Sequence, residues 1–151
     1  MKSYYFLIGI FIVLFSCSES NDQIDYDQIT KKIMTNAEQM ESLWNQGNLN
    51  AYMDFYYRSP ALFRIANQEF INGWEQAFGR YLYLYPSQEN LDKIKIVTES
   101  LDIISNQAAI HYGIRYYIDH DKKIKSSESF SILWKQIEGE WLIVKIHTCE
   151  S

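Results

Sequence analysis

Apolar residues along this chain follow two periods, a helical one before residue 86 and a strand-like one after residue 90. A first helix is predicted by apolar residues at helical spacing, namely Ile29, Ile33, Ala37, Met40 and Trp44. Asp27 is its expected N-cap and Gly47 its expected C-cap. Asn48 can cap a second, shorter helix that ends before Pro60. A third helix is predicted before Pro86 by the pattern of Trp74, Ala77, Phe78, Tyr81, Leu82 and Tyr85.

Strand patterns flank the third helix on both sides. Short strands are predicted over residues 61–66 and 68–71, and long strands over 91–105, 108–118, 126–137 and 141–148. Glu138-Gly139-Glu140 predicts a tight hairpin between the last two of them. Helices followed by a run of antiparallel strands predict an α+β fold, in which the helices cover one face of a curved sheet.

The N-terminus predicts an exported lipoprotein. Lys2 precedes an apolar run, Tyr4 to Phe15, which is too short to span a hydrocarbon core of about 30 Å but suits a signal peptide. The run ends in Leu14-Phe15-Ser16-Cys17, which resembles a bacterial lipobox. An ordinary secretory signal with an incidental cysteine is the alternative.

The lipobox resemblance implies that residues 1–16 are removed and that Cys17 is diacylated, which anchors the protein to a membrane. Ser18 is not the Asp that favours retention in the inner membrane, so the resemblance implies the outer membrane. Residues 17–26 are mostly polar and acidic and predict a flexible tether. Residues 27–151 would then form one domain.

Composition excludes several classes of protein. The net charge is −5, and an acidic domain without a basic patch argues against nucleic acid as a partner. The three histidines have no neighbouring ligands at metal-site spacing, and no Gly-rich phosphate loop is present, so neither a metal nor a cofactor is expected. With Cys17 lipidated, Cys149 would have no intramolecular partner.

Three segments together resemble a known superfamily. They are Leu43 to Tyr52; Ile71-Asn72-Gly73-Trp74 with Tyr81 and Tyr85; and Leu133 to Thr148, which contains the Gly139-Glu140-Trp141 turn. Their order and spacing are similar to the nuclear transport factor 2-like superfamily, in particular its SnoaL-like branch, which includes the association domain of calcium/calmodulin-dependent kinase II. The resemblance covers residues 27–151. It implies a cone, in which a bent sheet wraps around three helices and stays open at one end, but this fold hosts many functions.

The last strand alternates strictly in sequence. Trp141, Ile143, Lys145 and His147 share one face, and the family position of the strand implies that this face points into the cone. His147 would then be a hydrogen-bonding pocket group or a general base, unless neighbouring groups simply satisfy it. The opposite face is apolar and would be the contact surface of a homodimer, through Leu142, Val144 and Ile146.

Arg115 shares a strand face with His111 and Tyr117. If that face looks inward, Arg115 would bind an anion, most naturally a carboxylate; if the apolar face is the core instead, Arg115 is solvated. The kinase association domain has an Arg at a similar place. Glu99 and Asp102 are the acids considered as partners of Arg115 within the domain.

Aromatic side chains would complete such a pocket, with Tyr117 donating a hydrogen bond and Trp134 stacking on the ligand. The other candidate pocket aromatics, which can equally be plain core, are Trp44, Tyr56, Trp74 and Tyr81. We therefore expect a lipid-anchored domain whose pocket binds a small molecule without catalysis, an anionic one if Arg115 faces inward. The alternatives are an enzyme of isomerase or dehydratase type with His147 as base, and a purely assembly domain.

Overall fold

The computed structural model describes residues 23–87 and 91–150. The signal peptide, the lipobox and Cys17 lie outside the described residues. The helices of the described part are α1 (Tyr26–Asn45), α2 (Leu49–Met53) and α3 (Trp74–Leu84). Its strands are β1 (Phe63–Ala66), β2 (Glu69–Asn72), β3 (Lys93–Ser105), β4 (Ala108–Ile118), β5 (Ile124–Ile137) and β6 (Glu140–Glu150).

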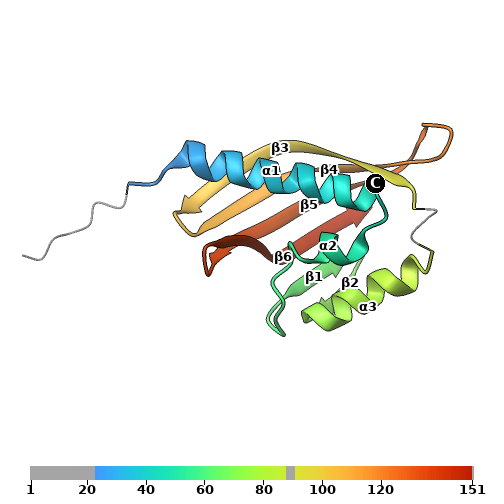
Figure 1. The fold of residues 1–151 in the computed structure, drawn as a ribbon, viewed down its shortest axis with the longest axis horizontal. Coiled ribbons are helices and arrows are strands. Elements are labelled where there is room, and N and C mark those ends of the chain that lie inside the picture. The colour runs from blue at the N-terminus through green and yellow to red at the C-terminus, as the bar shows by residue number, and fades with distance from the viewer. Residues whose placement is uncertain (1–22, 88–90, 151) are drawn as a thin grey trace, which may run out of the picture.

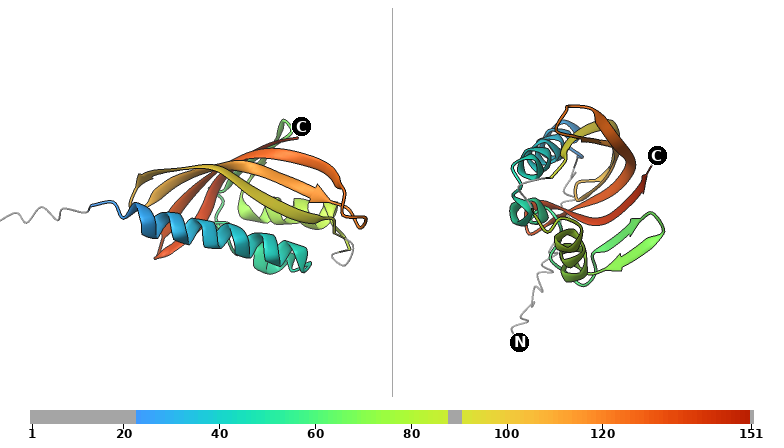
Figure 2. Two further views of the ribbon diagram at one scale, coloured as in Figure 1. Left: turned by 90° about the horizontal axis from the view of Figure 1, so that it is seen from above. Right: turned by 90° about the vertical axis from the view of Figure 1, so that its right-hand side faces the viewer.

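The strands form a six-stranded sheet in the order β2-β1-β6-β5-β4-β3. All neighbours are antiparallel except β1 and β6, which run parallel and join the short hairpin to the long strands. The sheet curves strongly, and the helices lie on its concave side (Figures 1 and 2). This arrangement confirms the predicted α+β fold with helices on one face of a curved sheet.

Local sequence explains where α1 begins and ends. The N-cap is Asp25, not Asp27 as predicted: the Asp25 carboxylate accepts a hydrogen bond of 2.9 Å from the Gln28 amide. At the other end Gly47 adopts a positive φ of 74°. Its amide and that of Asn48 donate to the carbonyls of Trp44 and Leu43, at 2.8 and 2.9 Å. This is a Schellman cap, and it turns the chain directly into α2.

Side chains of α1 cover the edge of the sheet at β3. Asn45 bonds both backbone groups of Ile94, since its Nδ2 donates to the carbonyl at 2.9 Å and its Oδ1 accepts from the amide at 2.7 Å. The Glu41 carboxylate accepts from the Ile96 amide at 2.7 Å. These contacts close one side of the cone and occupy backbone groups that would otherwise be an open sheet edge.

The core fills the space between the helices and the concave face. Its largest fully buried side chains are Trp44, Trp134, Tyr52, Tyr56, Ile33 and Met40. Rings of Trp44, Tyr52 and Tyr81 meet edge to face at centroid distances of 5.2 to 6.0 Å. Most of the predicted aromatic residues therefore belong to this core.

Strand β6 breaks the strict alternation that its sequence predicts. Trp134 pairs with Ile143 but Leu133 pairs with Lys145, so Val144 has no partner in the register. This bulge shifts the phase of the strand: Ile143 is buried before it, and Ile146 after it. Two predictions are therefore wrong. His147 is exposed on the outer face instead of facing the cone, and Ile146, 2% exposed, belongs to the core instead of a dimer surface.

Candidate functional site

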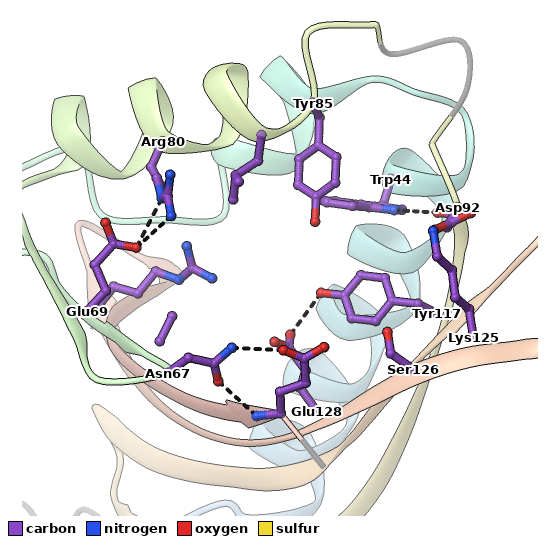
Figure 3. A pocket seen from close by; sticks show the side chains of 14 residues that line it. Trp44, Asn67, Glu69, Arg80, Tyr85, Asp92, Tyr117, Lys125, Ser126 and Glu128 are labelled. Carbon is purple, nitrogen blue, oxygen red and sulfur yellow. Dashed lines mark hydrogen bonds and ion pairs between the residues drawn. The ribbon is translucent and has the colours of Figure 1, made fainter.

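A pocket of about 500 Å³ lies at the end of the cone where α1 and α3 end. Figure 3 shows the Glu69–Arg80 pair on one side of the pocket and the Asp92–Lys125 pair on the opposite side. The hydroxyls of Tyr85 and Tyr117 point into the space between them, and Glu128 lies below (Figure 3). Of the predicted ligand-binding residues, Trp44 and Tyr117 line this pocket.

Arg115 is buried and faces inward, as one of its two alternatives predicts, with 2% of its surface exposed. Its Nη1 lies 2.5 Å from Oε1 of Glu128, and the Tyr117 hydroxyl donates to the same oxygen at 3.1 Å. Glu128 thus neutralises Arg115 from the neighbouring strand. This corrects the prediction that an exogenous anion would be the counter-charge of Arg115. Glu99 and Asp102 are exposed on β3 and are not its partners.

Arg64 is the cation of the pocket lining that has no ion pair among the described residues. It lies on β1, lines the pocket and is 7% exposed. Its guanidinium has no hydrogen bond or ion pair with any residue that the structure describes, and its Nε is fully buried. The guanidinium lies 4.9 Å from the centroid of the Tyr81 ring. The other cations that line the pocket, Arg80 and Lys125, are paired with Glu69 and Asp92 at 2.9 and 2.8 Å.

Three tyrosine hydroxyls form a buried chain below the pocket. Tyr56 Oη lies 3.2 Å from that of Tyr52 and 3.3 Å from that of Tyr81. Burial raises the pKa of Tyr52 and of Tyr56. Burial also acts to raise the pKa of Tyr81, but the positive charges of Arg64 and Arg115 outweigh it, and the pKa of Tyr81 is lowered. Tyr81 therefore lies in the positive field of these two arginines.

The remaining predicted site residues lie elsewhere. Trp134 is fully buried in the core, and Tyr56 and Tyr81 are buried without lining the pocket. Trp74 begins α3, where its indole donates to the Met53 carbonyl at 3.2 Å and Arg58 lies 4.4 Å from its ring centroid. His147 is on the outer face. The pocket thus takes in only part of the predicted set.

Sequence reasoning missed Arg64 and Glu128, although each left a signal. Arg64 is the single charged residue in the apolar segment 61–66, where a solvated position is not expected. Glu128 is in phase with Phe130, Ile132 and Trp134, which form the buried face of β5. A charged residue in phase with a buried face predicts a buried ion pair or a binding site.

Neither a metal cluster nor a membrane span is found in residues 23–87 and 91–150. No three His, Cys, Asp or Glu side chains gather there in a way that could hold a metal ion. No helix in these ranges is long and apolar enough to cross a membrane.

Comparisons with known proteins place the fold. A nuclear transport factor 2-like protein of unknown function from Shewanella oneidensis is 30% identical, with a TM-score of 0.75 over 80% of this chain and 98% of that one. A candidate calcium/calmodulin-dependent kinase II association domain from Xanthomonas campestris is 15% identical, with a TM-score of 0.65 over 85% and 92%. A cystatin-like protein of unknown function from Nostoc punctiforme is 10% identical, with a TM-score of 0.69 over 85% and 96%. No protein-family model and no curated protein matches the chain.

Proposed function

This chain belongs to the nuclear transport factor 2-like family, and from that premise we propose that its cone pocket binds a small anionic molecule through Arg64. Binding without catalysis is the function that the geometry supports best. The role that the sequence suggested for Arg115 passes to Arg64, because Glu128 already neutralises Arg115.

The observation that carries this proposal is the unpaired guanidinium of Arg64. An arginine keeps its charge at any relevant pH, and a buried charge without a partner is costly. Arg64 has 7% of its surface exposed and faces a pocket that has room for a small molecule. A carboxylate can accept two parallel hydrogen bonds from a guanidinium, so an anion of this kind would satisfy both the charge and the free donors.

The pocket also supplies contacts for the uncharged part of a ligand. The Tyr85 hydroxyl and the Ser126 side chain are hydrogen-bonding groups of its lining, and Trp44 adds an aromatic surface. Such a mixture of a few polar groups and aromatic surface is usual for small-molecule sites.

The structure does not support the alternative that the protein is an enzyme with His147 as its general base. His147 is exposed on the outer face and cannot act as a base inside the cone. His111 is buried, but it does not line the pocket, and its Nε2 is engaged by Thr98 Oγ1 at 2.8 Å. Neither histidine can therefore serve as a general base in the pocket.

Calorimetric titration of the full-length chain in mild detergent with acetate, propionate and pentanoate tests the proposal. We expect binding to the wild type and a tenfold to hundredfold loss in Arg64→Gln, about the worth of a charge-assisted hydrogen bond. Arg58→Gln is the matched control, because Arg58 is exposed and lies outside the pocket. Failure of all three carboxylates to bind, or equal binding to both variants, would contradict the proposal.

We also propose that the domain is held at the outer membrane through lipid on Cys17. The support is the short apolar run followed by Leu14-Phe15-Ser16-Cys17 and by Ser18. Several acyl chains, at about 0.8 kcal/mol per buried CH₂ group, form a stable anchor. Mass spectrometry of the mature N-terminus should find a diacylated Cys17, and an unmodified Cys17 or a different cleavage site would refute this.

A further inference from the structure

We propose that the ligand is a zwitterion, an amino carboxylate whose carboxylate binds Arg64 and whose ammonium group binds Glu128 and Glu150. This inference rests on the proposed function, since it assigns the second half of the same site. It starts from Glu128 and Glu150, the two acidic side chains of the pocket that take no part in the salt bridges with Arg80 and Lys125.

Glu128 and Glu150 lie side by side in the pocket. They are direct partners in the register of β5 and β6, and both line the cavity. Directly opposite residues on one face of an antiparallel pair have Cβ atoms about 5 Å apart, and like charges at such positions are destabilising. A cation between them would remove this repulsion.

Donors of the described domain residues satisfy only one oxygen of each of these two carboxylates. Arg115 and Tyr117 both donate to Oε1 of Glu128, and Asn67 Nδ2 donates to Oε2 of Glu150 at 3.1 Å. The second oxygen of each carboxylate has no donor among the described residues. Glu128 is only 9% exposed, and it lines the pocket, so its second oxygen is an acceptor open to a ligand there. An ammonium group, with three donors and a positive charge, fits two neighbouring carboxylate oxygens.

Pairing the charged residues in and next to the pocket also indicates a zwitterionic ligand. Arg80 pairs with Glu69, Lys125 with Asp92, and Arg115 with Glu128. These pairs leave one cation, Arg64, and one carboxylate, Glu150, without a partner of opposite charge in the described part of the chain. No ion pair joins these two. A ligand that carries both charges would satisfy the two ends at once, whereas a simple anion would leave the charge of Glu150 without a partner.

Matched ligand pairs separate this inference from the proposed function. Each pair differs by one terminal ammonium group: acetate and glycine, propionate and 3-aminopropionate, pentanoate and 5-aminopentanoate. Titrated at pH 7 into the full-length chain, at least one amino acid should bind tenfold or more tightly than its parent carboxylate, because it adds a charge-assisted contact. The chain length with the largest gain reports the separation of the two charge sites.

Variants test whether the affinity gained from the ammonium group comes from Glu128 and Glu150. Glu150→Gln should abolish the preference for the amino acid, and Glu150 is an exposed residue whose replacement spares the core. Glu99→Gln, exposed on β3 and outside the pocket, should change neither. If carboxylates bind and the ammonium group adds no affinity, or if Glu150→Gln keeps the preference, the zwitterion is overturned and the proposed function stands. If neither member of any pair binds, the proposed function falls, and this inference with it.

Discussion

His111 is a buried histidine in an apolar setting. It is 1% exposed, and its ring meets the ring of Phe130 edge to face at 5.0 Å. Its Nε2 bonds Thr98 Oγ1, while its Nδ1 is buried without a partner in the described part of the chain. Burial, and secondarily the charge of Arg115, lower the pKa of His111 to about 4. The folded protein therefore holds the His111 ring in its neutral form at pH 7.

This burial predicts a loss of stability in acid. An unfolded histidine has a pKa of about 6.5, so between that pH and about pH 4 the unfolded chain binds more protons than the folded one. The free energy of unfolding should fall by up to about 3 kcal/mol as the pH drops through this window. Urea unfolding at pH 7 and pH 4.5 measures it. His111→Gln should lose most of this slope and the exposed His147→Gln should keep it; equal slopes in both variants would refute the assignment.

Neighbouring strands explain which parts of the site the sequence could predict. Arg115 is directly opposite Glu128 in the register of β4 and β5. The period of the strand put Arg115 on one face with His111 and Tyr117 and left open whether that face looks inward. The identity of its partner depends on the register, which the intervening turn sets. Arg64 reaches the pocket because β1 adds to β6 in parallel, a pairing between segments about 80 residues apart along the chain. Such long-range pairings leave no local pattern in a single sequence.

Helix and strand positions were easier to predict, because caps and periods are local. Asn48 caps α2 as predicted, since its side chain accepts from the Ala51 amide at 3.2 Å. Glu138 and Gly139 both adopt positive φ, as a two-residue hairpin turn requires. The bulge at Val144 had no such signal, because the residues around it continue to alternate plausibly. Because the sequence does not reveal the extra residue in β6, the faces predicted for His147 and Ile146 were wrong.

The contact between α1 and β3 predicts how the cone opens. Asn45→Ala removes both hydrogen bonds to the Ile94 backbone and should cost about 1 to 2 kcal/mol of unfolding free energy. Hydrogen exchange should show faster exchange at the Ile94 and Ile96 amides, with β4 and β5 protected as before. Gln46→Ala is the control, because the one described partner of the Gln46 side chain is Ser42 Oγ, within α1 itself. Unchanged exchange at Ile94 would show that the edge is held by other contacts.

The interior of the molecule contains buried charged side chains next to its apolar core. Arg115 is buried without lining the pocket, and it pairs with the buried Glu128 of the pocket lining. Arg64 adds a further buried charge to that lining. A buried ion pair gains little over a well-packed apolar core, so these charges are consistent with the binding role that we propose. The cone is filled by aromatic side chains over most of its depth, and the pocket is the part that the core leaves open.

The outer face of the sheet remains the expected site of a homodimer, with Ile146 removed from it. All the described helices lie on the concave side, which leaves the other face without helical cover (Figure 2). Residues of this face that are apolar or aromatic include Ile110, Tyr112, Ile114, Leu133 and Leu142. Val144, which the sequence also assigned to the dimer face, is buried, with 9% of its surface exposed. Apolar residues on a sheet face without helical cover favour a partner, and we propose a second copy, which offers the same face.

Replacing Tyr112 tests this dimer. Tyr112 is 37% exposed, so Tyr112→Glu should leave the single domain folded but put a buried carboxylate into the centre of the contact. Light scattering of the wild type at tens of micromolar should give twice the mass of one chain, and the variant should give the mass of one. Tyr83→Glu is the matched control, because Tyr83 is 76% exposed on α3, far from the sheet face. A wild type that stays monomeric at high micromolar concentration, or a control that dissociates as Tyr112→Glu does, would rule out this surface.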